Sequence, residues 1–248
     1  MFHFNLSRVD LLVLDDDGAT PADLQDVIGA SGDEFRDQFT RLCLYLALSG
    51  GDPSRPRADD TVVVGTEYGN IVAVADLQRA AVSQGRRLSA QVFPQAHSSA
   101  AAASVSLAIG ATGRNMTLNA ARLTPVLSLW HVLSAFALGR SGRGHLLVGD
   151  VYSPEALLDA RNDDPDLRCR SAMAYGVLTA GDEFAARFEF TRDEAGPAPE
   201  DRNGAFATAG FLRSVLGLRP GESAALCCQS RDGRRATVTV SRKDDDDE

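Results

Sequence analysis

Cysteine and histidine supply many of the nucleophiles, bases and metal ligands of proteins, and this chain has four of each. No two cysteines have CxxC spacing, and we interpret them as ordinary core thiols. They are Cys43, Cys169, Cys227 and Cys228. No two histidines have metal-ligand spacing, so a structural role is expected for each. They are His3, His97, His131 and His145. The sequence therefore predicts no metal site and no cofactor.

Other catalytic motifs are also missing from the sequence. There is no GxSxG, no P-loop and no GxGxxG that opens a helix after a strand. A basic, glycine-rich loop at residues 139–144 follows a predicted helix and precedes a predicted strand, which is the wrong order for a phosphate site. We interpret this loop as a turn.

The stretch from residue 93 to residue 151 predicts helix, strand, buried helix and strand. Residues 97–109 are rich in small side chains, and residues 115–120 form a short strand-like run. Residues 127–138 are apolar nearly all round, which is typical of a helix buried on several sides. Gly139 ends that helix, and a buried strand starts at His145.

Residues 113–122 read GRNMTLNAAR. This run resembles the strand of type GPNMTVSTAC in β-ketoacyl synthases and the wider thiolase-like superfamily. In that family the strand delivers a cysteine to the N-terminus of a buried helix, where the helix dipole favours a thiolate. The matching position here is Arg122. Because a guanidinium only donates hydrogen bonds, no acyl thioester can form at this residue.

The resemblance extends from about residue 34 to about residue 152. Thr61–Gly65 is a buried strand whose following turn and helix, to about Ser83, match the family form VVVGSxxG. Phe93 and Pro94 open a segment similar to FPxxxxN. The resemblance implies an α/β, thiolase-like layered α-β-α fold with the N-terminal half retained and the C-terminal half strongly reduced.

The second half of the chain matches the family pattern at few positions. Residues 167–180 are expected to form a strand, 183–190 a strand beside it, and 194–204 a linker. Residues 203–212 are similar to GHxxGAAGxL, with Gly204 at the histidine position, and the segment for the other catalytic histidine is missing. Residues 224–240 predict a hairpin around Asp232-Gly233. All three catalytic positions are thus lost, and we predict that the chain is not an enzyme.

A chain that keeps the scaffold of a condensing enzyme but lacks its catalytic residues resembles a chain length factor. The resemblance implies a heterodimer with an active cysteine-bearing ketosynthase of a type II polyketide synthase, joined through the NMT-type strands, with acyl carrier protein engaged through the complex. The short length resembles the subunits of highly reducing polyene systems. The predicted tunnel and interface residues are Ser98, Ser99, Ala102, Ser106, Met116, Thr117, Leu118, Asn119 and Arg122, with Leu107 or Met116 as a possible tunnel end.

Two other functions stay open. One is an acyltransferase that uses Ser98, Ser99 or a cysteine, although no base stands at motif spacing. The other is a stand-alone module that binds an acyl group or a carrier protein through basic residues. These residues are Arg140, Arg143, Arg231, Arg234 and Arg235.

Length and charge limit the remaining classes. The 248 residues, 44% of them hydrophobic, predict one domain over residues 1–243 and an acidic disordered tail over 244–248. The net charge of −9 argues against nucleic acid as a binding partner, and no apolar run is long enough to span a membrane. A cytoplasmic protein is expected. Helices are also expected after a Thr20 cap with Pro21 and over residues 34–48.

Overall fold

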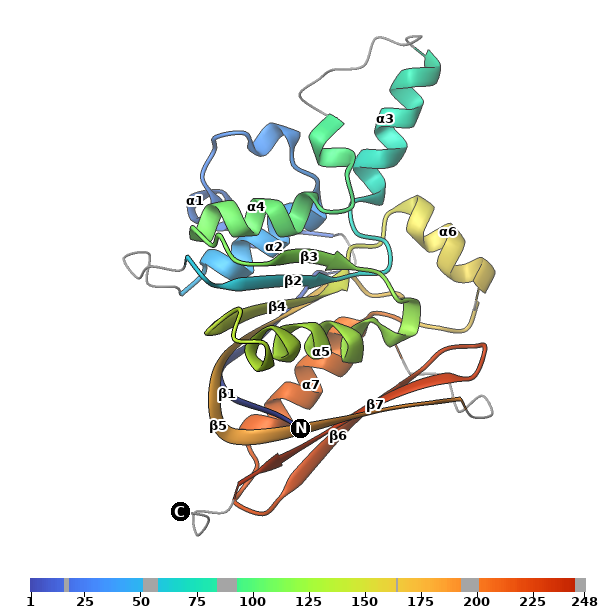
Figure 1. Ribbon diagram of the computed structural model, residues 1–248. Coiled ribbons are helices and arrows are strands. Elements are labelled where there is room, and N and C mark those ends of the chain that lie inside the picture. The colour runs from blue at the N-terminus through green and yellow to red at the C-terminus, as the bar shows by residue number, and fades with distance from the viewer. Residues whose placement is uncertain (16–17, 51–57, 84–92, 164, 193–200, 244–248) are drawn as a thin grey trace.

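The computed structural model of the chain describes residues 1–15, 18–50, 58–83, 93–163, 165–192 and 201–243. Strands and helices alternate through most of its length (Figure 1). The strands are β1 (Phe2–Val13), β2 (Thr61–Gly65), β3 (Asn115–Leu118), β4 (Arg143–Asp150), β5 (Ala172–Arg192), β6 (Ser223–Gln229) and β7 (Arg234–Arg242). The α-helices are α1 (Leu24–Ile28), α2 (Gln38–Leu48), α3 (Ile71–Ser83), α4 (Ala100–Ile109), α5 (Thr124–Ala137), α6 (Pro154–Asp163) and α7 (Gly204–Leu216). The 3-10 helices are η1 (Asp33–Phe35), η2 (Phe93–Ala96) and η3 (Ala121–Leu123).

The strands form one seven-stranded sheet in the order β3-β2-β4-β5-β7-β6, and β1 also pairs with β5. β2 runs parallel to both β3 and β4, whereas all pairs that involve β5 or β7 are antiparallel. β3 lies at one edge of the sheet, as expected for residues 115–120. The C-terminal ends of β2, β3 and β4 therefore meet at the same edge of the parallel part of the sheet.

β5 is a single 21-residue strand, so the prediction of two adjacent strands at 167–180 and 183–190 was wrong. β5 curves from the upper part of the sheet to the lower part (Figure 1). Its register with β1 jumps between Phe4 and Asn5, which skips residues 180–183. A Cβ atom on Gly181 would lie 2.3 Å from the Asn5 side chain, so this bulge requires glycine. The glycine that interrupts the sequence pattern bends one strand instead of separating two.

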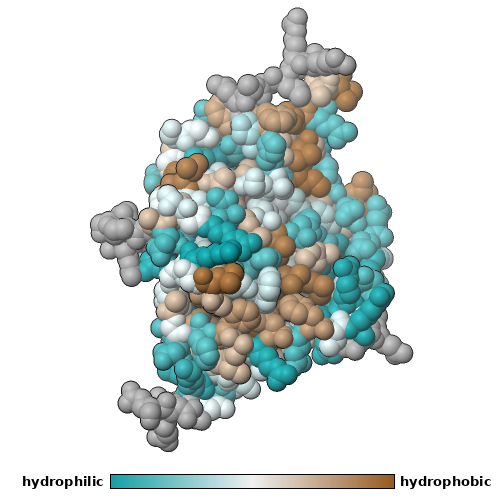
Figure 2. Space-filling view, viewed as in Figure 1, coloured by the Kyte–Doolittle hydropathy of each residue, from teal (hydrophilic) through white to brown (hydrophobic). Residues whose placement is uncertain are grey.

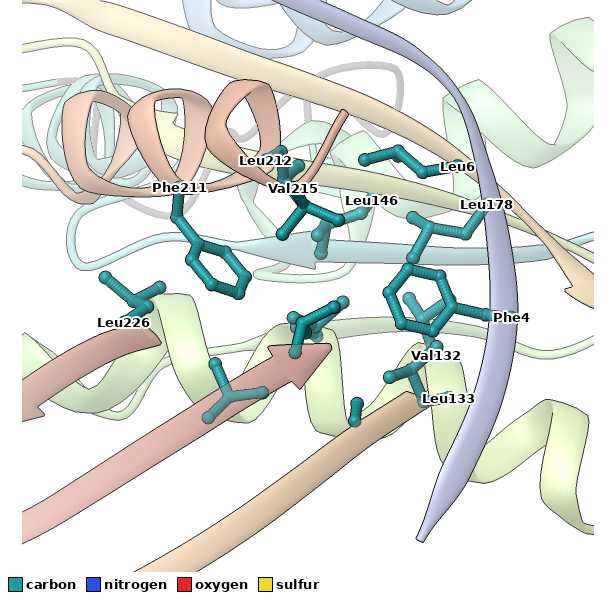
Figure 3. Packing of buried hydrophobic residues seen from close by; sticks show 14 of the residues in the cluster. Phe4, Leu6, Val132, Leu133, Leu146, Leu178, Phe211, Leu212, Val215 and Leu226 are labelled. Carbon is teal, nitrogen blue, oxygen red and sulfur yellow. The ribbon is translucent and has the colours of Figure 1, made fainter. Parts of the chain in front are cut away.

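The curvature of β5 places α5 and α7 between two parts of the same sheet (Figure 1). α5 contacts β2 and β4 on one side and β6 and β7 on the other. Figure 3 shows Val132 and Leu133 of α5, Phe211 of α7 and Leu226 of β6 pointing into one core. This double cover explains why the sequence of α5 is apolar nearly all round, and the prediction of a helix buried on several sides is confirmed.

A second core lies on the opposite face of the sheet, where α2 and α4 pack. Ala101 and Ala102 of α4 are almost fully buried there, beside Leu42 and Leu46 of α2. Small side chains let the helix approach its neighbours closely. α4 begins at Ala100, three residues later than predicted from His97.

Some predicted boundaries differ from the structure. The first short helix begins at Leu24 after Asp23, so Thr20 is not its cap. α2 begins at Gln38 because the Asp37 side chain accepts a hydrogen bond from the Thr40 amide, while Asp33–Phe35 form a 3-10 turn. The β6–β7 hairpin is confirmed, with Gly233 at φ +82° in its turn. Residues 244–248 lie outside the described residues, so the tail and the domain limit stay predictions.

Candidate functional site

A cavity of about 380 Å³ opens where the parallel strands end. It is bounded by the ends of β2 and β4, the starts of α5 and α7, and the β6–β7 hairpin. Its lining residues are Gly65, Glu67, Ala121, Arg122, Thr124, Pro125, Val148, Asp150, Asp201, Arg202, Asn203, Gly204, Ala207, Cys227, Cys228, Gln229 and Arg235. The carboxyl ends of parallel strands are the usual place for ligand sites in α/β proteins.

Arg122 lies in η3, between β3 and the first residue of α5, and its side chain helps to line the cavity. The preceding residue, Ala121, has φ +47°, a left-handed conformation that is strained for a residue with a Cβ. Asn119 supports this turn because its Oδ1 accepts from the Ala121 amide at 3.1 Å and its Nδ2 donates to the Glu67 carbonyl at 2.7 Å. Strand β3 thus delivers Arg122 to the N-terminal end of a buried helix.

Gly204 is the first residue of α7 and also lines the cavity. A Cβ added here would lie 2.8 Å from Pro125 Cγ and 3.4 Å from Val148 Cγ1. The first contact is too short for a real Cβ, so the packing of α7 against α5 leaves no space for a side chain. A histidine at this position would need a different helix arrangement.

Asp150, at the end of β4, is the most constrained carboxylate of the site. Its Oδ1 accepts hydrogen bonds from Thr66 Oγ1 at 2.5 Å, the Glu67 amide at 2.9 Å and the Tyr68 amide at 2.7 Å. Burial raises the pKa of Asp150 to about 6, and the hydrogen bonds from Thr66 and Tyr68 counteract part of that effect. Asp150 therefore fixes the turn that follows β2.

Arg202 and Asn203 hold the start of α7, although the sequence placed them in a linker. The Arg202 side chain is 4% exposed and donates to both carboxylate oxygens of Glu67 and to Asp163 Oδ2 at 2.8 Å. Asn203 caps α7 by accepting from the Ala205 amide at 3.0 Å, and its Nδ2 donates to the carbonyl of Asp150 at 3.0 Å. The linker prediction was wrong for residues 201–204, and residues 193–200 lie outside the described residues.

Two adjacent cysteines of β6, Cys227 and Cys228, line this cavity. Burial raises the pKa of the Cys228 thiol to about 12, although the Val126 amide at the start of α5 points at the sulfur and lowers it somewhat. Cys227 is exposed, and its Sγ accepts from Arg235 Nε at 2.9 Å. Cys43 is buried in the second core and Cys228 is partly buried against the first, so the prediction of four core cysteines was wrong for Cys169 and Cys227. A thiol with a pKa near 12 is a poor nucleophile at neutral pH.

The predicted tunnel and interface residues lie mostly away from the cavity. Ser98 and Ser99 are exposed before α4, whereas Ala102 and Ser106 are buried within the second core. Met116, Thr117 and Leu118 are half-buried on β3. The outward side of α4 instead carries Ser104 and Leu107, and Leu107 is 83% exposed. Of the predicted tunnel and interface residues, Arg122 is the one that lines the cavity. Gly204, Cys227, Cys228 and Arg235, which the sequence singled out for other reasons, line it as well.

His145 is buried within β4, which begins two residues earlier than the predicted start at His145. Its Nδ1 lies 2.7 Å from Tyr175 Oη, and its Nε2 lies 2.8 Å from Asp60 Oδ2. His97 packs against the ring of Phe93, at 5.0 Å between centroids. In the described ranges no group of three or more His, Cys, Asp or Glu side chains could hold a metal ion. Likewise, no helix in those ranges has the length and apolarity to cross a bilayer.

No family model matches the sequence, and no curated protein matches it. Solved structures are similar in fold. The ishigamide ketosynthase/chain length factor has a TM-score of 0.74 at 17% identity, covering 90% of this chain and 86% of that one. A chain of the ketosynthase ApeO in complex with its chain length factor ApeC, from Xenorhabdus doucetiae, has a TM-score of 0.65 at 11% identity, covering 98% of this chain and 100% of that one.

A β-ketoacyl synthase from Burkholderia phymatum STM815 has a TM-score of 0.63 at 13% identity, over 90% of this chain and 86% of that chain. These similarities confirm the predicted thiolase-like fold of the ketosynthase type. The chain thus has the architecture of ketosynthases and chain length factors, with an arginine at the place where its own β3 meets α5.

Proposed function

We propose that this chain is a non-catalytic chain length factor that pairs with an active, cysteine-bearing ketosynthase and helps to bound the tunnel for the growing chain. The observation that carries the proposal is the open edge of β3. Within the described part of the chain, β3 pairs only with β2. An unpaired edge strand is a template for pairing with another chain.

The hydrogen bonds of β3 show which backbone groups face that open edge. The Val62 amide donates to the Arg114 carbonyl, and the Thr66 amide donates to the Leu118 carbonyl. Because every second residue of a parallel strand bonds to the same neighbour, Met116 and Leu118 face β2, whereas Asn115 and Thr117 face away. The amides of Asn115 and Thr117 are therefore the groups that a second strand would meet.

Exposed apolar side chains on α4, which contacts β3, and on α3, which contacts η2 and α6, support a partner. Leu107 of α4 is 83% exposed, and α4 contacts β3. On α3, Val74 is 43% exposed and Val82 is 82% exposed. Figure 2 shows apolar residues gathered at the end of the molecule that α3 occupies in Figure 1. A pairing of this kind would bury more than ~2,000 Å² in total.

The geometry at Arg122 and Gly204 supports the absence of condensing chemistry. Arg122 offers no nucleophile, and Gly204 has no room for a side chain between α7 and α5. We expect Arg122→Cys to restore no condensing activity in the isolated chain. Loading and elongation of an acyl thioester by that variant alone would refute the absence of condensing chemistry. Labelling of the wild type by an electrophilic acyl probe at Ser98, Ser99 or a cysteine would instead favour the acyltransferase alternative.

The finer parts of the proposal concern the product. A polyene product, engagement of acyl carrier protein through the complex, and a tunnel bounded by α4 are all proposed. Ala102 and Ser106 can take larger side chains only by moving α2, because both are buried. Ser104→Phe, on the outward side of α4, is the better test. It should shorten the product of the complex and leave assembly intact.

The direct test is co-expression with candidate cysteine-bearing ketosynthases, followed by size-exclusion chromatography with light scattering. We expect a one-to-one complex. Thr117→Pro removes one amide from the open edge without removing a bond to β2, and it should abolish the complex. Thr191→Ala on β5, far along the chain from β3, is the control and should leave it unchanged. A monodisperse monomer that ignores the ketosynthase would refute the proposal.

A further inference from the structure

One face of α5 is only partly covered by the described part of this chain. Val132 and Leu133 point from the covered face into the core (Figure 3). The other face carries half-buried side chains three or four residues apart, a spacing that places them on one side of a helix. They form the outer stripe of α5, which consists of Leu127, Trp130, His131 and Ser134. Figure 2 shows apolar residues gathered along the front of α5, which is labelled in Figure 1.

The outer stripe lies on the β3 side of α5. α7 packs beside α5 and contacts β4 and β5, so it covers the side of α5 that is turned away from β3. The charge of Arg114, directly before β3, acts on His131 of the stripe. A strand paired with the open edge would lie about 4.8 Å beyond β3. The part of a partner that packs against such a strand would therefore meet the outer stripe.

His131 has no partner for a second ring proton. Its Nδ1 is buried and has no hydrogen-bond partner among the residues that the structure describes. A protonated imidazole carries an N–H on both nitrogens, so protonation in this position leaves a buried donor unsatisfied. Burial and the positive charge of Arg114 lower the pKa of His131 below its ordinary value. The neutral ring is therefore the form that this site favours.

The elements around His131 offer no negative charge to stabilise a proton. α5 contains no acidic or basic residue apart from His131 itself, and β2 and β3 contain none. The other strands that contact α5, together with α7, meet its covered face with apolar side chains. These include Phe4, Leu178, Phe211, Leu226 and Val238.

The ionisable groups closest to α5 in the fold lie away from the outer stripe. Asp150 and Arg122 line the cavity beside the first turn of α5, about two turns before His131. His145 of β4 lies beside Val62 in the sheet, on the face that carries the second core, and it contacts Asp60 there. Arg114 is thus the charge that faces His131, and it opposes protonation.

We propose that the ketosynthase covers the outer stripe of α5 and that His131 makes this assembly depend on pH, because the complex accepts the neutral ring and excludes the protonated one. This role rests on the proposed function and adds a regulated surface to it. A partner that removes water from the stripe disfavours the charged ring further, so the complex binds a proton at His131 less readily than the free chain does. The affinity is then highest at neutral pH and falls as the pH drops through the pKa of His131 in the free chain.

The affinity for the ketosynthase is measured by biosensor titration at pH 7.5 and at pH 5.5, and the ratio of the two dissociation constants is compared between proteins. The ratio should be larger for the wild type than for His131→Gln by about twofold or more, because glutamine does not titrate. Asp150 also titrates in this range, but both proteins contain it, so its effect cancels. His131→Lys places a permanent charge on the stripe and should weaken binding at pH 7.5 by about tenfold or more.

His3→Gln and His3→Lys are the matched controls, since His3 is an exposed histidine on β1, which does not pair with β3. Both should keep the affinity and the pH ratio of the wild type. Melting temperatures close to that of the wild type show that each variant is folded. Equal ratios for the wild type and His131→Gln, or an unchanged affinity of His131→Lys, would overturn the role of His131 and leave pairing through β3 intact. Absence of any wild-type complex at pH 7.5 would refute the proposed function as well.

Discussion

Two helices of nearly equal length, α5 with 14 residues and α3 with 13, are both apolar and have opposite surroundings. Most of α5 is buried between two parts of the curved sheet, whereas Ala73 is the only buried residue of α3. The strands that bury α5 belong to this chain. The difference shows that apolar composition alone does not determine whether a helix is buried.

Truncation of one buried and one exposed leucine tests the same principle, that burial and not apolar composition determines the stabilising effect of a side chain, and gives the largest expected effect. Leu133 of α5 is fully buried, and Leu107 of α4 is 83% exposed. Leu133→Ala should lower the free energy of unfolding by about 2–5 kcal/mol, because it removes buried methyl groups and leaves a cavity. Leu107→Ala should change it by less than about 0.5 kcal/mol. Urea denaturation measures both, and equal losses would refute the assignment of the two surfaces.

The buried charge beside α5 predicts a pH effect of intermediate size. The pKa of Asp150 is raised in the fold to about 6 from its ordinary 3.8, so the folded state binds more protons than the unfolded state between these values. The contribution of Asp150 to stability is therefore largest below pH 4 and is lost as the pH rises through 6. The shift corresponds to about 3 kcal/mol.

Asp150→Asn isolates this effect because asparagine does not titrate. The wild type should lose up to about 3 kcal/mol of unfolding free energy relative to Asp150→Asn between pH 4 and pH 7.5. Urea denaturation of both proteins at the two pH values gives the difference. A difference that does not change with pH would mean that Asp150 titrates as in an exposed peptide.

A charge at the exposed apolar positions of α3 and α4 should have the smallest effect on stability. Val82→Asp and Leu107→Asp should each change the free energy of unfolding by less than about 0.5 kcal/mol. Leu107→Asp should nevertheless weaken the complex with the ketosynthase at least tenfold, since it would place a charge in an apolar interface. Biosensor titration measures this loss. An unchanged affinity would exclude α4 from the interface.

Local sequence patterns predicted the elements that depend mainly on residues close by in the sequence. The strand at Thr61–Gly65, β3, α5 and the β6–β7 hairpin all follow from apolar runs and from turn residues. β5 was predicted as two strands, one on each side of Gly181. Its role as a bend depends on contact with Asn5, which is distant in the sequence.

The site was predictable only in part, for a similar reason. Arg122 and Gly204 were found from their places in a family pattern. Arg202 and Asn203 follow a stretch rich in proline and acids, and their burial depends on Glu67, Asp150 and Asp163, far along the chain. No local pattern signals an arginine that will be buried by distant carboxylates. The Asp201-Arg202-Asn203 run before a small-residue helix was the available clue, since asparagine favours helix N-caps.

The most direct test of the account is hydrogen exchange at single-residue resolution along β3, with and without the ketosynthase. In the free chain the amides of Asn115 and Thr117 face the open edge and should exchange quickly, whereas those of Met116 and Leu118 bond to β2 and should be protected. In the complex we expect the Asn115 and Thr117 amides to become protected while Met116 and Leu118 remain so. A complex that forms with no change at Asn115 and Thr117 would contradict pairing through β3.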